Sequence, residues 1–86
     1  MPTISEFFGI LIRMYYDDHN PPHFHAYYGE HEAIILIETL EIVEGKLPKR
    51  AKAMVIEWAF EHRQDLIATW RLAELHQPLK KIEPLE

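Results

Sequence analysis

Residues 23–37 have the sequence HFHAYYGEHEAIILI, which predicts a β-hairpin. Gly29 and Glu30 suit a two-residue type II′ turn, because glycine stands in the first position, where the backbone needs a positive φ. The β-branched and aromatic residues on both sides of this turn are typical of strands. We therefore expect one strand over residues 23–28 and a second over residues 31–37.

The two-residue turn also fixes which side chains share a face of the hairpin. Tyr28 is expected to pair with His31, and the register then places His25 opposite Ile34. Successive side chains alternate between the two faces. One face carries His23, His25, Tyr27, Glu32, Ile34 and Leu36. The other carries Phe24, Ala26, Tyr28, His31, Ala33, Ile35 and Ile37. The second face is the more apolar, so we expect the helices to cover it.

Further strands are expected on either side of the hairpin. The segment Gly9–Tyr16 is rich in β-branched and aromatic residues and predicts a strand. Residues 17–22 should then form a rigid loop, since the two successive prolines at its end fit neither a helix nor a central strand. Glu41–Glu44 predicts a short strand that ends at Gly45.

The second half of the chain is expected to be helical. Pro48 is well placed at a first helical position. Residues at helical spacing then form one stripe, namely Ala51, Met54, Val55, Trp58 and His62. The pattern continues to about His76, but a single helix from Pro48 to Leu75 would be roughly 42 Å long, too long for so small a domain. We therefore place a break near residues 62–64.

Together these elements predict an α+β fold, an antiparallel sheet of three to four strands followed by two helices packed on one face. Trp58 and Trp70 are expected to be the large anchors of the core. Residues 1–86 would form a single domain. It divides into a sheet half over 9–45, a helical half over 48–76 and a tail over 77–86. Within the tail, Leu79–Ile82 suits either a short terminal strand or a packed segment.

Composition is that of an ordinary globular protein and excludes several classes of site. The 86 residues are 48% hydrophobic and 27% charged, and the lack of cysteine excludes disulfides, thiolate zinc sites and cysteine nucleophiles. The net charge of −5 disfavours nucleic acid as the sole partner. Apolar runs such as Ile34–Ile37 are too short to cross a membrane, and the first residues do not resemble a signal peptide. We expect a cytoplasmic protein with no membrane partner.

Histidines are the main candidates for a functional site. The sequence has six, and four of them fall between residues 19 and 31. His23 and His25 should point to the same side of their strand, about 6.6–6.8 Å apart, where they could share a metal ion. The preceding loop offers a third ligand from His19, Asp17 or Asp18. Two histidines with a carboxylate suit a divalent zinc, iron or manganese ion.

The same residues also suit roles that need no metal. Histidines on a half-exposed strand often bond a neighbouring carboxylate, and Glu32 shares a face with His25. The hairpin face and the proline loop could instead contact a partner protein through Pro21, Pro22, Tyr27 and Glu32. No nucleophile with a recognisable motif accompanies the histidines, so no catalytic residue is assigned.

A basic cluster lies where the helical half begins. Four positive charges fall within seven residues, at Lys46, Lys49, Arg50 and Lys52. Lysines and free backbone N–H groups at a helix start could bind phosphate or another anion. A solvated face, neutralised by the glutamates that precede it, is the simpler interpretation, because positive charge at a helix start opposes the macrodipole.

Several motifs together resemble a known family. The core is DHNPPHFHA at residues 18–26, accompanied by MPTI at residues 1–4, EGKLP at residues 44–48, Glu57-Trp58 and Trp70. In this combination the chain resembles, over nearly its whole length, the small bacterial family Domain of Unknown Function 4160. The resemblance implies a stand-alone, bacterial, cytoplasmic domain. It also implies a gene beside that of another small protein, an arrangement that looks like a toxin–antitoxin or regulatory module.

Two hypotheses of function follow. The first is a non-enzymatic, protein-binding or regulatory component of such a two-gene module, whose partner is the neighbouring gene's product or a second copy of the chain. The alternative is a metal-dependent hydrolase or RNase, with His19, His23 and His25 as ligands and the basic cluster binding phosphates. Stoichiometric metal that is lost in the variant His23→Ala would favour the enzyme.

Overall fold

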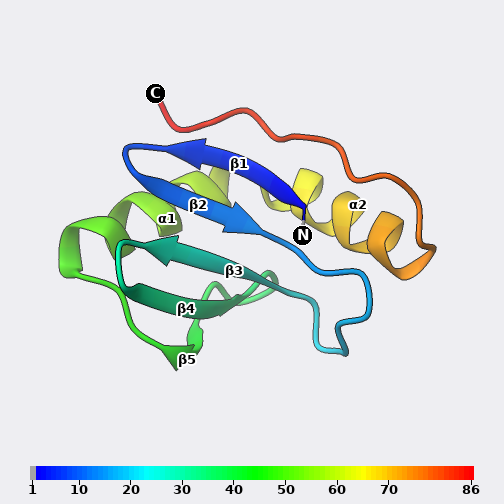
Figure 1. Ribbon diagram of the computed structural model, residues 1–86, viewed down its shortest axis with the longest axis horizontal. Coiled ribbons are helices and arrows are strands. Elements are labelled where there is room, and N and C mark those ends of the chain that lie inside the picture. The colour runs from blue at the N-terminus through cyan, green and yellow to red at the C-terminus, as the bar shows by residue number, and fades with distance from the viewer. Residues whose placement is uncertain (1) are drawn as a thin grey trace.

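Five strands and two helices make up the protein in the computed structural model, which describes residues 2–86. The strands form one antiparallel sheet in the order β1-β2-β3-β4-β5 (Figure 1). The elements are β1 (Thr3–Phe7), β2 (Ile10–Arg13), β3 (His23–Tyr28), β4 (His31–Leu36), β5 (Ile42–Gly45), α1 (Lys49–Glu61) and α2 (Arg63–Glu74). The α+β fold is therefore confirmed, with five strands where the sequence predicted three to four.

The central hairpin has the predicted register. Tyr28 pairs with His31 and His25 with Ile34, and Gly29 takes the positive φ, +58°, that the turn requires. The apolar face of the hairpin is buried as expected, through Phe24, Ala26, Ala33, Ile35 and Ile37. His31 lies beside the turn at the end of this face and is exposed.

The additional strand is β1, which pairs with β2 through a tight turn at Phe8 and Gly9. Both turn residues have positive φ, 49° and 80°, as a two-residue type I′ turn requires. Phenylalanine is an unusual residue for such a position, and the turn was not predicted. The predicted strand over Gly9–Tyr16 is correspondingly shorter, because the chain leaves the sheet after Arg13.

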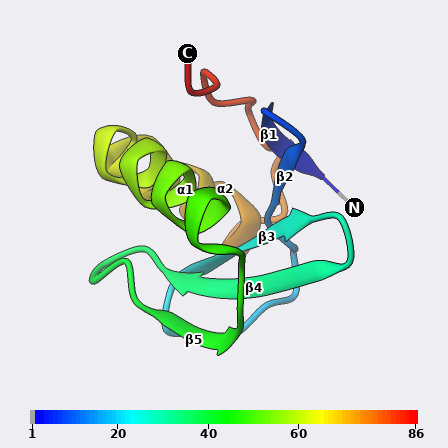
Figure 2. The same ribbon diagram turned by 90° about the vertical axis from the view of Figure 1, so that its left-hand side faces the viewer.

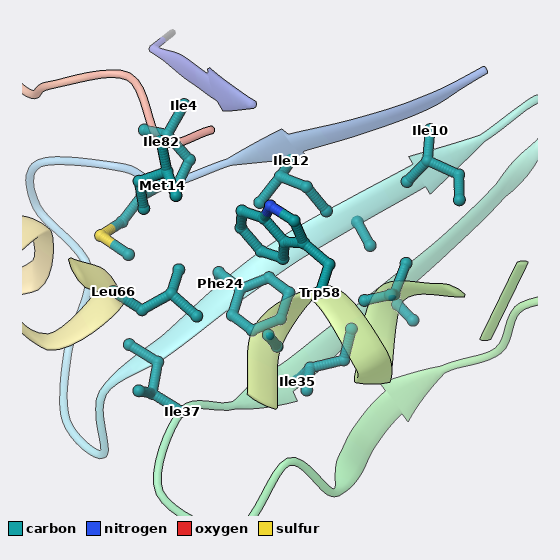
Figure 3. Close-up of a cluster of buried hydrophobic side chains, with 14 of the residues drawn as sticks. Ile4, Ile10, Ile12, Met14, Phe24, Ile35, Ile37, Trp58, Leu66 and Ile82 are labelled. Carbon is teal, nitrogen blue, oxygen red and sulfur yellow. The ribbon is translucent and has the colours of Figure 1, made fainter. Parts of the chain in front are cut away.

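Both helices cover one face of the sheet (Figure 2). The predicted break is confirmed, since α1 ends at Glu61 and α2 begins at Arg63, with His62 between them in a non-helical conformation. Trp58 and Trp70 are both buried, and Trp58 lies at the centre of the core, where its ring contacts Phe7 and Phe24 (Figure 3). Among residues 2–86, neither helix combines the length and the apolar character that a membrane span needs.

The C-terminal tail is a packed segment rather than a strand. It runs back along β1 (Figure 1), where the Ile82 N–H donates a 2.7 Å hydrogen bond to the Ile4 carbonyl. The indole N–H of Trp58 donates to the Glu83 carbonyl, also at 2.7 Å. The Ile82 side chain is buried in the same core as both helices. The tail therefore closes the open side of the core beside β1.

Candidate metal centre

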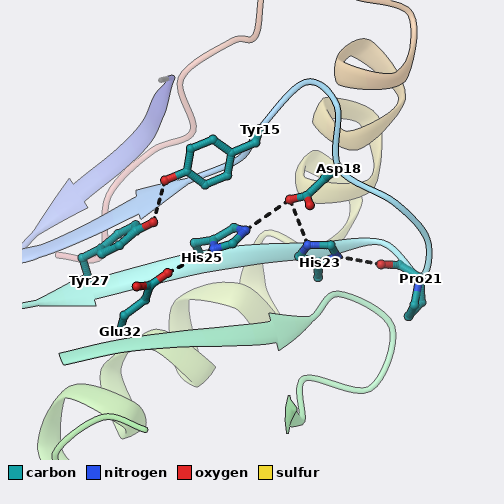
Figure 4. Close-up of polar contacts among 7 residues, drawn as sticks. All are labelled: Tyr15, Asp18, Pro21, His23, His25, Tyr27 and Glu32. Atoms are coloured by element: carbon teal, nitrogen blue, oxygen red, sulfur yellow. Dashed lines mark hydrogen bonds and ion pairs between the residues drawn. The ribbon is translucent and has the colours of Figure 1, made fainter. Parts of the chain in front are cut away.

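Asp18, His23 and His25 meet where the proline loop returns to the sheet (Figure 4). His23 and His25 alternate along β3 and so point to the same side, as the period of a strand dictates. Asp18 comes from the preceding loop, whose Asn20–Pro21 peptide bond is cis. Its Oδ2 atom lies 2.9 Å from Nε2 of His23 and 3.2 Å from Nε2 of His25. Two imidazole nitrogens thus converge on one carboxylate oxygen.

The other nitrogen of His23 determines where this ring carries a proton. Nδ1 lies 2.8 Å from the Pro21 carbonyl oxygen, which can only accept a hydrogen bond, so Nδ1 must donate. In a neutral ring, Nε2 would then direct a lone pair at Asp18 Oδ2. Two acceptors at 2.9 Å repel each other. The contact is favourable only when a second proton or a metal cation occupies the space between the ring and the carboxylate.

His25 repeats this arrangement with a different acceptor. Its Nδ1 atom faces Glu32 Oε2 across the hairpin at 3.5 Å, and it forms no hydrogen bond with good geometry. The Glu32 side chain is 52% exposed, so a small rotation would complete the contact. In both histidines, Nδ1 faces an oxygen acceptor and Nε2 faces the common point. Histidines that bind metals are usually held in this way by a second group behind the ring.

Aromatic side chains hold the two imidazoles in place. Trp70 of α2 packs against the His23 ring, with ring centroids 5.2 Å apart, and the edge of Tyr15 meets the His25 ring at 4.6 Å. The Tyr15 and Tyr27 hydroxyls are hydrogen-bonded to each other. Burial, the hydrogen bond with Tyr15 and the charge of Glu32 together raise the pKa of Tyr27 well above its usual range. Tyr27 is therefore a neutral hydrogen-bonding group.

The loop residues suggested as third ligands have different positions. Asp18 is the one that joins the two histidines. The neighbouring Asp17 side chain is 89% exposed and lies 3.5 Å from Nε2 of His76. His19 is exposed, with its ring centroid 6.3 Å from that of His23, and contributes no atom to the cluster. Of the three loop residues suggested as third ligands, the structure brings Asp18 to the two histidines and leaves Asp17 and His19 outside the cluster.

A comparison with models of known protein families finds one that matches most of the chain. The model described as "Domain of unknown function (DUF4160)" matches residues 9–71. The chain belongs to the DUF4160 family. The matched region contains Asp18, His23 and His25 and ends before the tail, whereas no curated protein and no solved structure matches the chain.

The other predicted surfaces of this DUF4160 protein are separate from the cluster. The basic cluster is fully on the surface, at the end of the molecule opposite the proline loop (Figure 1). Pro21 and Glu32 border the histidines and are exposed, whereas Pro22 and Tyr27 are half-buried. Sequence reasoning did not find Trp70 or the Pro21 carbonyl as neighbours of His23. No local pattern marks these two groups, since only the folded chain brings them to the ring.

Proposed function

We propose that this DUF4160 protein binds a divalent transition-metal ion through Nε2 of His23, Nε2 of His25 and a carboxylate oxygen of Asp18, and that it is a metal-dependent hydrolase. The observation that carries the proposal is the proton position on His23. The Pro21 carbonyl commits the only proton of the neutral ring to Nδ1, so the Nε2 lone pair faces a carboxylate oxygen at 2.9 Å. A cation at that point turns a repulsive contact into coordination.

The spacing of the three groups fits such an ion. Their ligand atoms lie within 4.8 Å of one another. Zinc bonds of about 2.0–2.1 Å place neighbouring tetrahedral ligands roughly 3.4 Å apart, so the two distances from Asp18 to the histidines need to lengthen by only a few tenths of an ångström. Nitrogen and oxygen ligands of this kind suit zinc, iron or manganese.

A set of three protein ligands leaves coordination positions for water and substrate. A bound divalent ion would lower the pKa of its water, which supplies a nucleophile at neutral pH. A shallow depression lined by Pro2, Tyr15, Tyr16, Asp17 and Asp18 adjoins the cluster and offers access from solvent. The basic cluster lies at the other end of the molecule, which favours a small ester, amide or phosphoester over RNA.

Metal content of protein purified without an affinity tag or chelator tests the proposal. We expect about one equivalent of metal in the wild type and a large loss in Asp18→Asn and in His25→Ala. Asp17→Asn is the matched control, because it removes the same charge from the adjacent residue, whose side chain is exposed outside the cluster. Circular dichroism of each variant separates loss of metal from loss of fold.

Two results would contradict the proposal. One is a wild type that takes up none of zinc, manganese and ferrous iron. The other is equal metal in the wild type and in Asp18→Asn. If metal binds as expected, a panel of ester, amide and phosphoester substrates should show hydrolysis that is lost in both His25→Ala and Asp18→Asn.

A regulatory role in a two-gene module of the bacterial cytoplasm is the second candidate function. It is favoured by the exposure of Pro21 and Glu32 beside the histidines, which gives a partner protein direct access to this face. Co-expression with the product of the neighbouring gene tests it. We expect a stable complex that Glu32→Lys weakens, whereas a chain that purifies free of that product contradicts this role.

A further inference from the structure

The outer side of α1 has a second stripe, opposite the one that packs on the sheet. Buried residues of the helix are Ala51, Val55, Trp58 and Ala59. A shallow depression on the other side is lined by α1 alone, through Lys49, Lys52, Ala53, Ile56, Glu57, Phe60 and Glu61. These positions recur at the spacing of one helix face. Phe60 is 68% exposed and therefore leaves a large apolar surface in contact with water.

The charges on this stripe are arranged unfavourably for an isolated chain. Its lysines lie in the first half of α1 and its glutamates in the second, with no acidic residue in the first turn and no basic residue in the last. The helix macrodipole favours the opposite order. Glu57 and Glu61 are also four residues apart, where like charges repel. All ion pairs among residues 2–86 involve histidine, so Lys49, Lys52 and both glutamates have no such partner within the chain.

We propose that the outer stripe of α1 is a dimer interface, in which α1 of a second copy packs antiparallel across a two-fold axis. In that arrangement Lys49 of one copy faces Glu61 of the other, and Lys52 faces Glu57. The small side chain of Ala53 faces Ile56 of the second copy, which lets the two helices approach closely. A parallel arrangement would oppose like charges at both ends. A single surface thus carries both halves of a self-complementary contact, as two-fold symmetry requires.

The stripe runs from Lys49 to Glu61, which is about 18 Å of helix, twelve steps of 1.5 Å each. A contact of this length is at the small end of specific interfaces, so we expect a dimer with a dissociation constant in the micromolar range. Each helix also gains the charges that it lacks, because the partner's glutamates lie at its start and the partner's lysines at its end. This proposal does not depend on the metal centre, because Asp18, His23 and His25 all lie outside α1.

Charge exchange provides a sharp test by sedimentation velocity. The variant Lys49→Glu/Lys52→Glu has an acidic stripe throughout, and Glu57→Lys/Glu61→Lys a basic one. Each alone should weaken dimerisation at least tenfold, because like charges then face each other. An equimolar mixture of the two should form a heterodimer that is tighter than the wild-type dimer, and salt should weaken it.

Lys80→Glu/Lys81→Glu in the exposed tail is the matched control for Lys49→Glu/Lys52→Glu, since it makes the same change in net charge away from the stripe. It should leave the dimer unchanged. The variants at the start of α1 should fold, because acidic residues there suit the macrodipole, and circular dichroism checks this. A wild-type protein that stays monomeric at concentrations of hundreds of micromolar overturns the proposal. The stripe would then be a candidate contact for a different protein. A dimer that survives both charge variants, or a mixture that does not associate, also overturns it.

Discussion

At the scale of single residues, Gly45 shows how closely one position can be constrained. It ends β5 with φ +75°, and a Cβ atom added there would lie 2.0 Å from the backbone oxygen of Glu32. That oxygen also accepts the Lys46 N–H at 3.1 Å. The overlap is with main chain, so no side-chain rotation relieves it. The strands β4 and β5 can approach this closely only because residue 45 has no side chain.

Gly45→Ala should therefore lower the free energy of unfolding by about 3 kcal/mol, at the upper end of ordinary single substitutions. Gly29→Ala is the comparison, because Gly29 also has a positive φ but its added Cβ meets nothing within 4 Å. Gly29→Ala should lower the free energy of unfolding only by the strain of a left-handed backbone at an alanine, roughly 1–2 kcal/mol. Urea unfolding of both variants measures the difference. If both variants lose the same free energy of unfolding, β4 and β5 move apart easily enough to accommodate a Cβ atom at residue 45.

The candidate site shows which residues the sequence could predict. The shared face of His23 and His25 follows from the two-residue period of a strand and was predictable. The choice of Asp18 over Asp17 and His19 was not. It depends on backbone angles within the proline loop, and three adjacent polar residues carry no periodicity to separate them. Local pattern identifies ligands on regular elements and leaves loop ligands undetermined.

At the scale of elements, the sequence predicted those with strong local signals. The β3–β4 hairpin and the break between α1 and α2 were both predicted, from a glycine turn and from helix length. β1 was not predicted, because the turn that follows it places Phe8 at a positive φ. Phenylalanine has no preference for such a conformation, so the sequence does not indicate a turn there. The tail was left open between strand and packed segment, because its role depends on the groups it meets, the Ile4 carbonyl and the Trp58 indole.

The tail gives a prediction at this scale. Ile82→Ala should destabilise the protein by about 2–4 kcal/mol, because it removes a buried side chain and leaves a cavity beside Ile4. Lys81→Ala, at the adjacent exposed position, should change stability by less than about 0.5 kcal/mol. Thermal unfolding of the two variants tests this. Similar stability in both would show that the tail does not contribute to the core.

At the scale of the whole molecule, the candidate metal centre joins a loop, a strand and a helix that are distant in the sequence. Asp18 belongs to the proline loop, His23 and His25 to the sheet, and Trp70 of α2 packs against His23. A domain of this size buries a small core and is only marginally stable. The unfolded chain does not hold these groups together, so an ion that binds them adds its binding free energy to the stability of the fold.

Metal should accordingly raise the thermal stability of the wild type. At an ion concentration about a hundred times the dissociation constant, the gain is roughly 2.7 kcal/mol. For a domain of this size that corresponds to a rise in Tm of roughly 10–20 °C. Differential scanning calorimetry with and without zinc measures it, and a chelator should reverse it. Asp17→Asn should keep the full rise and Asp18→Asn should lose most of it. An equal rise in both variants would show that the Asp18 carboxylate is not a ligand of the bound ion, which contradicts the proposed centre.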